Sequence, residues 1–205
     1  ISHISNNAKY VDPPPNPTLE YKIAVTKNNT DNIIIEYFFM KVNIALLTVT
    51  DTRTLDNDKS GAILVDKFNE AGHNLVERKI CKDNKDEIVV ILKEWSKSTK
   101  IDVIITTGGT GLTGRDITPE ALNEIAEKHI PGFGEVFRNL SLKTVGTSAI
   151  QSRACAVLSN GKYIFALPGS SGGVTDAWDE ILKHQLDINH KPCNFVELFP
   201  RLKEK

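Results

Sequence analysis

The sequence has no strong net charge, no long apolar run and few cysteines. Its 25 Lys and Arg residues balance 26 Asp and Glu residues, so neither a general nucleic-acid binder nor an anionic-membrane binder is expected. No apolar run approaches the roughly 20 residues of a membrane-spanning helix. Cys81, Cys155 and Cys193 are scattered and form no C-x-x-C pair, which indicates neither a zinc site nor a disulfide framework. A reducing, cytoplasmic compartment is therefore expected.

The first forty residues lack features that the rest of the chain has. They contain no Arg and no Gly, and they include the sequences DPPPNP and KNNTDN. They show neither the ordered zones of a secretory signal nor the arginines of a transit peptide. The only methionine, Met40, directly precedes the first buried-strand pattern. We interpret residues 1–40 as a non-core extension and residues 41–205 as one domain. The alternative is a leader that packs on the domain, with residues 33–39 as an edge strand.

From residue 41 onward, strand and helix patterns alternate. Three apolar runs, two of them typical of strands buried on both faces, occupy residues 42–49, 74–80 and 101–107. Between them, apolar residues at helical spacing predict two helices, one through Phe68 and one through Trp95. Strands that alternate with helices favour a mainly parallel sheet with helices on both faces.

The last third of the domain adds a hairpin and a final helix. Two apolar stretches flank Asn160-Gly161, a strong signal for a tight β-hairpin turn. A Gly- and Ser-rich break follows, and residues 174–186 then have a helical pattern. The predicted fold class is α/β: a three-layer α/β/α sandwich whose mainly parallel sheet carries a short antiparallel hairpin.

The most distinctive stretch is TTGGTGLTGRDITPEAL, residues 106–122. Its glycines directly follow the strand predicted at 101–107, and ligands of open α/β sheets bind at such carboxyl edges. The stretch also satisfies G-x-G-x-x-G, but Pro119 places the predicted helix, capped by Thr118, five residues after the last glycine, too late for a dinucleotide fold. It resembles the phosphate loop G-x-x-x-x-G-K-[ST] only with Arg115 and Asp116 in place of the Lys and the hydroxyl residue. We reject both motifs; the remaining interpretations are an anion-binding loop and a tight turn without a ligand.

Two carboxylates lie near this loop in the predicted fold. Asp116 follows the glycines directly, and a carboxylate beside a phosphate site repels phosphate unless a cation bridges them. Asp83 follows the strand at 74–80, which places it at the same sheet edge. This pattern suggests a magnesium–nucleotide site; the alternative for Asp116 is a helix cap or a pair with Arg115.

Six other side chains each have a simpler structural interpretation. The histidines at 73, 129 and 190 lie in predicted loops or helix ends, and we expect them on the surface. Trp178, like Trp95, lies on an apolar helical stripe, which favours core packing over ligand stacking. Cys155 lies in a predicted strand, where a small buried apolar role is typical.

Arg153 and two phenylalanines leave alternatives open. Arg153 is equally compatible with holding a phosphate and with pairing to an acid. Phe133 and Phe137 are four residues apart, so they share one helix face, either at a subunit interface or in the subunit's own core.

Taken with the sequences PGFGEVFR, QSRACA and FALPGS, the glycine stretch resembles the MoaB/MogA family of molybdenum-cofactor biosynthesis, and MoaB more closely. The resemblance runs from about residue 42 to the sequence KPCNF near the end, with the motifs in the family's order and spacing. It implies the molybdopterin-binding fold of that family and self-association as a trimer or hexamer. It also allows contact with other proteins of the same pathway.

The resemblance implies an activity and a set of site residues. Active members adenylylate molybdopterin with Mg-ATP, and the family's two acidic positions match Asp83 and Asp116, which would hold Mg²⁺. The family's pterin-binding G-G-T-G and two further motifs match positions in this chain, and the family's Ser-Asp pair is here Thr-Asp. The implied substrate-binding residues are Thr50, Asp51, Gly108, Gly109, Thr110, Gly111, Ser152, Arg153, Pro168, Gly169 and Ser170.

Three function classes follow. The first is a molybdopterin adenylyltransferase, which the presence of both acidic residues favours. The second is a molybdopterin-binding carrier or scaffold without turnover, because some family members that lack one acid are inactive. The third is an interaction domain, which the absence of a long second domain disfavours.

Overall fold

The computed structural model describes residues 21–25 and 36–204, with side chains from Met40 onward. Six strands form one mixed sheet in the order β4-β3-β5-β8-β7-β6. The four strands β4, β3, β5 and β8 run parallel, whereas β7 pairs antiparallel with both β8 and β6. The strands of this sheet are β3 (Asn43–Val49), β4 (Asn74–Cys81), β5 (Val103–Thr107), β6 (Lys128–His129), β7 (Cys155–Ser159) and β8 (Lys162–Leu167).

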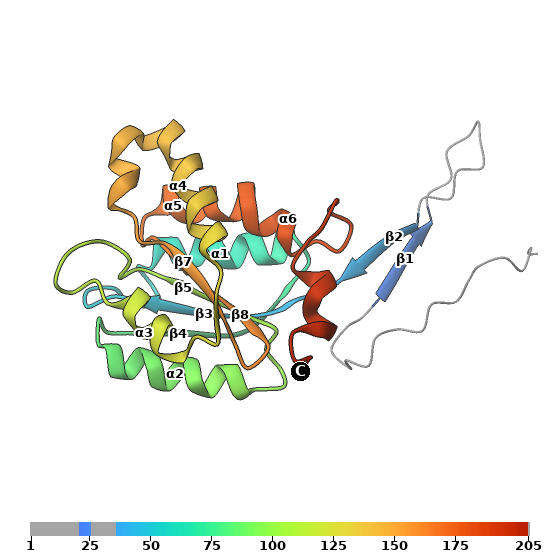
Figure 1. Ribbon diagram of the computed structural model, residues 1–205, viewed down its shortest axis with the longest axis horizontal. Helices are drawn as coiled ribbons and strands as arrows, with labels where there is room; N and C mark the ends of the chain where they lie inside the picture. The colour runs from blue at the N-terminus through green and yellow to red at the C-terminus, as the bar shows by residue number, and fades with distance from the viewer. Residues whose placement is uncertain (1–20, 26–35, 205) are drawn as a thin grey trace, which may run out of the picture.

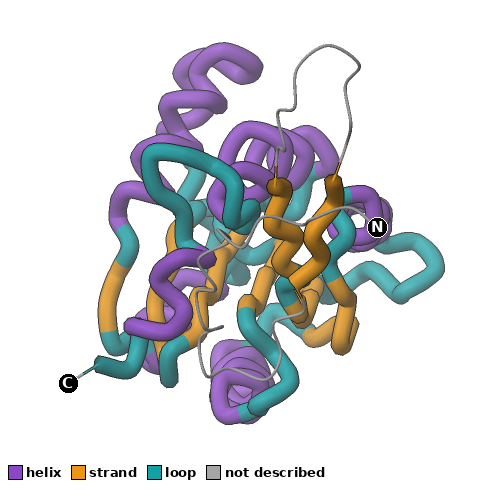
Figure 2. The backbone as a smooth tube through the Cα atoms, turned by 90° about the vertical axis from the view of Figure 1, so that its right-hand side faces the viewer, coloured by secondary structure: helices purple, strands orange, loops and turns teal. Residues whose placement is uncertain are grey.

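Helices cover both faces of the sheet (Figure 1). One face packs against α2 (Lys85–Lys97) and α3 (Thr118–Ile125). The opposite face packs against α1 (Lys59–Glu70), α4 (Pro131–Val145), α5 (Ser171–Ala177), the π-helix η2 (Trp178–Leu182) and the 3₁₀ helix η3 (Val196–Arg201). The short helix α6 (Lys183–Gln185) continues η2. Figure 2, turned by 90°, likewise shows helices on both sides of the strands. The predicted three-layer α/β/α sandwich is confirmed.

The predicted turns have the expected backbone geometry. The β7–β8 hairpin turns at Asn160 (φ 51°) and Gly161 (φ 70°), and positive φ at both residues is the requirement of a type I′ turn. Gly72 (φ 75°) follows the end of α1, as the sequence predicted. Trp95 and Trp178 are each 1% exposed, which confirms their core role.

The chain around Met40 differs from the expected boundary. Met40 was expected to close the non-core extension, but its side chain is 5% exposed and packs in the core on the α1 face of the sheet. It ends β2 (Glu36–Met40), which pairs antiparallel with β1 (Tyr21–Val25) in a separate two-stranded sheet. The alternative edge strand at 33–39 is therefore not part of the six-stranded sheet, as far as its described residues show. Most of the predicted extension lies outside the described residues.

Phe133 and Phe137 belong to the subunit's own core. They are 4% and 2% exposed, and the ring of Phe133 contacts that of Phe165 in β8 at a centroid distance of 5.1 Å. Of the two alternatives for this helix face, the structure contains the subunit's own core.

None of the helices among the described residues combines the length and the apolar character that a membrane-spanning segment needs.

His73 is buried, contrary to the surface position expected from its place after Gly72. It is 7% exposed, and its Nδ1 accepts a hydrogen bond from the Val42 N–H at 3.3 Å. Its ring also meets Trp178 edge-on. Burial lowers the pKa of His73 to about 4, against a smaller opposing effect of Asp187. The neutral ring is thus part of the core.

This burial predicts acid sensitivity. Between pH 6.5 and about 4 the unfolded chain binds a proton at His73 that the folded chain does not, so stability falls as the pH falls through that range. The difference amounts to roughly 3 kcal/mol. Denaturant unfolding from pH 7.5 to 4 should show this extra loss in the wild type and not in His73→Asn, which keeps an acceptor for Val42. The exposed His129→Asn variant is the control, and parallel curves for the wild type and His73→Asn would contradict the assignment.

Candidate active site

The carboxyl ends of the parallel strands open onto one cavity of about 440 Å³. Val49 ends β3, and the glycine loop after β5 forms the floor beside it. All of the site residues expected from the sequence line this cavity except Arg153. They come from the loops after β3, β4, β5 and β8 and from the residue after η1 (Gly146–Gln151). The chain thus brings together residues that are more than 100 positions apart.

Glycine is required at the start of the loop by the chain's own packing. Gly108 (φ 102°) lies so close to β3 that an added Cβ would be 2.2 Å from the Val49 carbonyl oxygen. At Gly109 (φ 64°) an added Cβ would be 2.4 Å from Thr118 Oγ1. A side chain at either position would therefore displace the loop itself.

Thr118 holds the loop and does not cap α3. The helix begins at Thr118, and Ile117 stands at the cap position without a side-chain hydrogen bond. The Thr118 hydroxyl instead donates to the Gly108 carbonyl at 2.8 Å, and its backbone N–H donates to the Gly109 carbonyl at 3.0 Å. The expected cap is wrong, because the hydroxyl finds a buried carbonyl across the loop.

Asp116 is fixed on the far side of the glycines. Its Oδ2 accepts from the Thr113 N–H at 2.8 Å and from the Thr113 hydroxyl at 2.7 Å, so it neither caps a helix nor pairs with Arg115. Partial burial acts to raise the pKa of Asp116, but the hydrogen bonds from Thr113 and Gly111 hold that pKa below its ordinary value of 3.8. Arg115 instead reaches toward Asp51, at 3.8 Å. Asp116 is therefore a fixed anion.

The surroundings of Asp83 shift its pKa in the opposite direction from that of Asp116. Burial raises the pKa of Asp83, and the charges of Asp51 and Asp116 raise it further. The Asp83 backbone N–H donates to Asp51 Oδ1 at 3.2 Å, which ties the loop after β4 to the loop after β3. The three carboxylates therefore repel one another at one end of the cavity.

This acidic end fits a cation shared with a ligand. Carboxylate oxygens are the donors that Mg²⁺ prefers, and a cation would relieve the repulsion that raises the pKa of Asp83. Within the described residues, no three His, Cys, Asp or Glu side chains are close enough to hold an ion by themselves. Phosphate oxygens of a nucleotide would complete such a coordination shell.

Arg153 supports the glycine loop from behind. Its Nε donates to the Gly111 carbonyl at 2.7 Å, its Nη2 donates to the Asp116 carbonyl at 2.7 Å, and its Nη1 pairs with Glu120. Of the two alternatives for this residue, the structure contains the pair with an acid. Its part in binding a phosphate stays a prediction.

No sequence pattern predicted Arg53 as a site residue. This residue lies in the polar loop after β3, lines the cavity, and donates to the Gly169 carbonyl at 3.1 Å. No short motif marks a lone Arg in a polar loop. Only the folded chain brings it beside a turn 116 residues away.

A model of the family described as "Probable molybdopterin binding domain" matches residues 45–188. Molybdenum cofactor biosynthesis protein B of Escherichia coli is 44% identical over 166 residues, which cover 81% of this chain and 96% of that protein. The chain belongs to the MoaB/MogA family. The Bacillus subtilis protein of the same name is 38% identical over 146 residues. The matched region covers 71% of this chain and 86% of that protein.

Solved structures of the family agree. A crystal structure of a molybdenum cofactor biosynthesis protein B superposes with a TM-score of 0.69 at 40% identity, over 71% of this chain and 91% of that one. The tungsten cofactor synthesizing protein MoaB from Pyrococcus furiosus gives 0.64 at 35% identity, over 71% and 92%. This chain therefore has the MoaB/MogA fold and a role in molybdenum-cofactor biosynthesis.

The opposite environments of the two acids predict separate titrations. Carboxyl NMR should find Asp83 titrating above 3.8 and Asp116 below it. Asp116→Asn should lower the pKa of Asp83, because one repelling charge is lost. Asp66→Asn, on the exposed surface of α1, is the control and should leave Asp83 unchanged. An Asp83 pKa that is the same in the wild type and in Asp116→Asn would show that the two acids are not coupled.

Proposed function

We propose that this protein adenylylates molybdopterin, using Mg-ATP and releasing pyrophosphate. The observation that carries the proposal is the convergence of a backbone-lined glycine loop with Asp83 and Asp116 in one cavity. Family membership supports the pterin as substrate, and both acidic positions are occupied. The three free cysteines are compatible with the reducing cytoplasm expected for this pathway.

The reaction needs positioning and charge neutralisation more than covalent help. A terminal phosphate oxygen of molybdopterin would attack the α-phosphorus of ATP, the bond from that phosphorus to the β-bridging oxygen would break, and pyrophosphate would leave. The attacking oxygen is already ionised at neutral pH, so no general base is required. The described residues that line the cavity include no histidine, which suits such a step.

Each part of the cavity has a role in this proposal. Backbone N–H groups of the glycine loop would hold the pterin phosphate, together with Ser152 and the turn at Pro168-Gly169-Ser170. The N–H groups of Gly109 and Thr110 would serve, because the Gly108 N–H already donates to the Leu167 carbonyl and the Gly111 N–H donates to Asp116. Thr50 and Asp51 would hold the ligand from the opposite loop. Asp83 and Asp116 would hold Mg²⁺, which supplies neutralisation of the nucleotide phosphates when bound.

The second candidate is a molybdopterin-binding carrier or scaffold that hands its ligand to another protein of the pathway. The same glycine loop would support it, since binding needs only the phosphate-holding part of the cavity. Turnover separates the two candidates.

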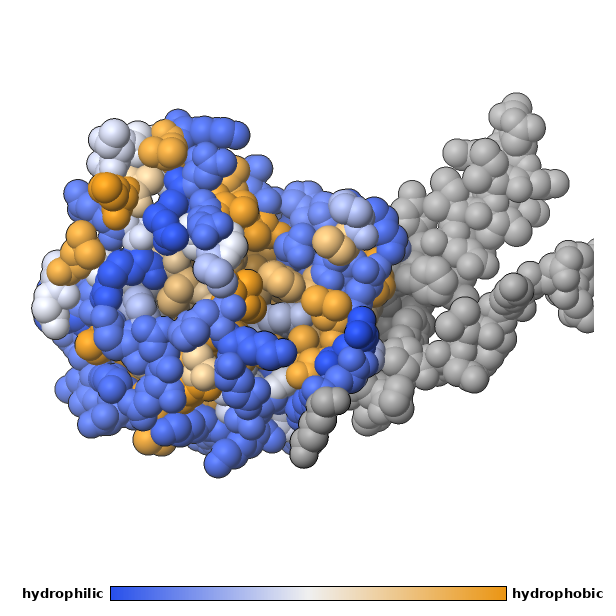
Figure 3. All heavy atoms as spheres, viewed as in Figure 1, coloured by the Kyte–Doolittle hydropathy of each residue, from blue (hydrophilic) through white to orange (hydrophobic). Residues whose placement is uncertain are grey.

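We also infer that the protein self-associates as a trimer or hexamer. Phe133 and Phe137 are buried and do not support this inference. The apolar surface formed by α4 and η1 does (Figure 3). Leu142, Val145 and Ile150 are 51%, 56% and 82% exposed there, and a monomer in water gains nothing from such a patch.

Removal of either acid should stop the reaction while leaving the pterin bound. In Asp83→Asn and Asp116→Asn we expect pyrophosphate release to fall about 100-fold or more, as when a transition-state charge loses its partner. Molybdopterin affinity should stay within a few-fold of the wild type, because the glycine loop is intact. Asp66→Asn is the matched control. Wild-type rates in both site variants would rule out the metal-binding role of Asp83 and Asp116. If the wild-type protein binds molybdopterin but releases no pyrophosphate, the carrier function is favoured over the enzyme.

Light scattering tests the assembly. The wild type should have the mass of a trimer or hexamer at micromolar concentration, and Leu142→Glu combined with Ile150→Glu should reduce it toward one subunit. Val90→Glu, an equally exposed apolar position on α2, should leave the mass unchanged. A wild type with the mass of one subunit would refute the inference.

A further inference from the structure

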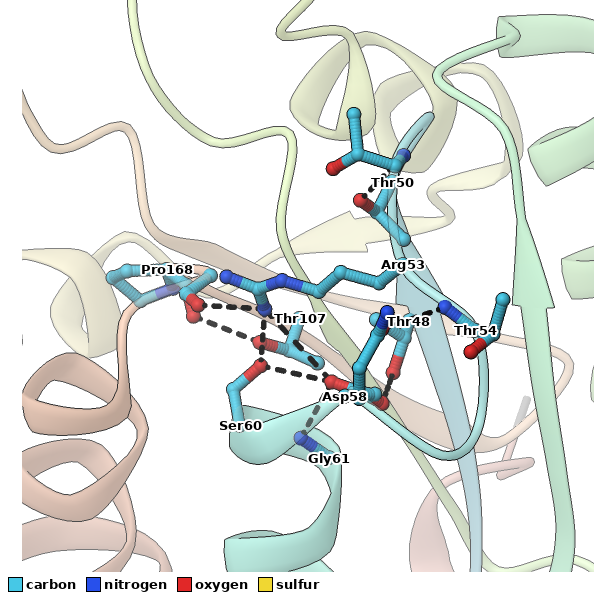
Figure 4. A network of polar contacts seen from close by, with 12 residues as sticks. Thr48, Thr50, Arg53, Thr54, Asp58, Ser60, Gly61, Thr107 and Pro168 are labelled. Carbon is cyan, nitrogen blue, oxygen red and sulfur yellow. Dashed lines mark hydrogen bonds and ion pairs between the residues drawn. The ribbon is translucent and has the colours of Figure 1, made fainter.

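A buried carboxylate behind the cavity organises the start of α1. The side chain of Asp58 is fully buried, and it caps the helix by accepting from the Gly61 N–H at 3.0 Å. It also accepts from the hydroxyls of Thr48 at 2.7 Å and Ser60 at 3.2 Å (Figure 4). Arg78 Nη2 donates to it as well, at 3.0 Å. Burial acts to raise the pKa of Asp58, but these donors hold it below the ordinary value. Asp58 therefore stays charged inside the protein.

The charge of Asp58 faces one further cation, Arg53. Arg53 Nη1 lies 3.8 Å from Asp58 Oδ1, and it donates to Ser60 Oγ at 2.9 Å and to the Gly169 carbonyl at 3.1 Å. In Figure 4 the Arg53 side chain extends across the opening from the loop after β3 toward Pro168. The guanidinium is thus fixed between the start of α1 and the turn after β8.

The anchored guanidinium keeps donors for a ligand. All of these protein contacts use Nη1, and among the described residues no protein group accepts from Nη2 or Nε. The side chain is 37% exposed and lines the cavity. A guanidinium carries five N–H donors in a planar fork that matches two phosphate oxygens, so the unused edge has the geometry of a phosphate contact.

Charge in the cavity is divided. Asp51, Asp83 and Asp116 lie at the acidic end, and the cavity lining supplies two cations. Arg115 is 74% exposed and reaches toward Asp51, so it is neither fixed nor free of the acids. Arg53 is the cation that the protein holds in place.

We propose that Arg53 binds a phosphoryl oxygen of the substrate through its free guanidinium edge, and that Asp58 is the positioning residue that fixes Arg53 against the turn at Gly169. The identity of the phosphate, on molybdopterin or on the nucleotide, rests on the proposed function; the contact itself is with any phosphate ester or anhydride in this cavity. Lys would not replace Arg53, because one ammonium cannot keep both protein anchors and a two-point phosphate contact.

The test compares Arg53→Gln and Arg53→Lys with the wild type by calorimetric titration of three probes: inorganic pyrophosphate, molybdopterin and Mg-ATP. We expect at least a 10-fold loss of affinity in Arg53→Gln and a smaller loss in Arg53→Lys. The probe that loses most identifies the phosphate. Lys67→Gln removes a half-buried cation paired with Asp179 at 2.7 Å, away from the cavity, and should bind all three probes like the wild type.

The salt dependence of binding separates a direct contact from a structural role. If Arg53 meets the phosphate, the slope of affinity against ionic strength should be shallower in Arg53→Gln, because one charge pair is lost. Asp58→Asn should weaken the same probe by a smaller factor and leave that slope nearer the wild-type value. Unchanged affinity in a folded Arg53→Gln variant, or weaker binding with an unchanged slope, would overturn the proposal.

The result is distinguishable from a failure of the proposed function. Arg53-dependent pyrophosphate binding in a protein that never adenylylates molybdopterin would support this contact and refute the activity. If the wild type turns over and Arg53→Gln equals it in rate and in affinity, the activity is supported and the Arg53 contact is refuted. A wild type that binds none of the three probes would refute both.

Discussion

The close approach of the glycine loop to two strand ends is the contact on which the site depends. Gly108 lies against the backbone of Val49, and an added Cβ at Gly169 would be 3.3 Å from the Gly108 Cα. The loops after β3 and β5 can therefore meet in this way only if position 108 has no side chain, and a side chain at position 169 would fit only if the loop shifted by a few tenths of an ångström. The hydrogen bonds of Thr118 and Arg153 then hold the loop from the other side. The result is a cavity lined by backbone groups at a topological edge where ligands of this fold class bind.

Fixed charges of both signs line the cavity around this neutral loop. The acids at 51, 83 and 116 lie close enough for two of them to raise the pKa of Asp83. Arg53 lies toward the turn after β8 and is held by a buried carboxylate, so its position does not depend on solvent. These two environments suit a ligand in which one phosphate meets a guanidinium and another is bridged to carboxylates by a metal. Preorganised charge of this kind requires little rearrangement when the ligand binds.

Local patterns in the sequence predicted most of the fold, and the family resemblance added most of the residues that line the cavity. Strands buried on both faces are continuous apolar runs, and the Asn160-Gly161 turn and the glycine loop have local backbone requirements, so each was readable from a short stretch. Contacts between segments far apart in the sequence could not be predicted from a short stretch. His73 follows a helix-ending glycine as surface residues do, but β3 places a backbone N–H and Trp178 places a ring against it. Thr118 has the pattern of a helix cap, yet a carbonyl ten residues earlier takes its hydroxyl.

Within the site, Arg53 is a further residue whose role could not be predicted from a local pattern. Its position as an anchored cation depends on Asp58 and Gly169, which are far apart in the sequence and meet Arg53 only in the folded chain. Phe133 and Phe137 were ambiguous for a related reason, because helical spacing fixes a shared face and says nothing of what covers it. The core of the subunit covers that face, while the exposed apolar residues of α4 and η1 lie elsewhere.

The most direct test of the central claim is ³¹P NMR of the wild-type protein with molybdopterin and Mg-ATP. The account predicts a new phosphoanhydride resonance from adenylylated molybdopterin and an equal amount of free pyrophosphate, both dependent on Mg²⁺. An unchanged spectrum with protein that binds both ligands would contradict the proposal that this cavity performs the transfer.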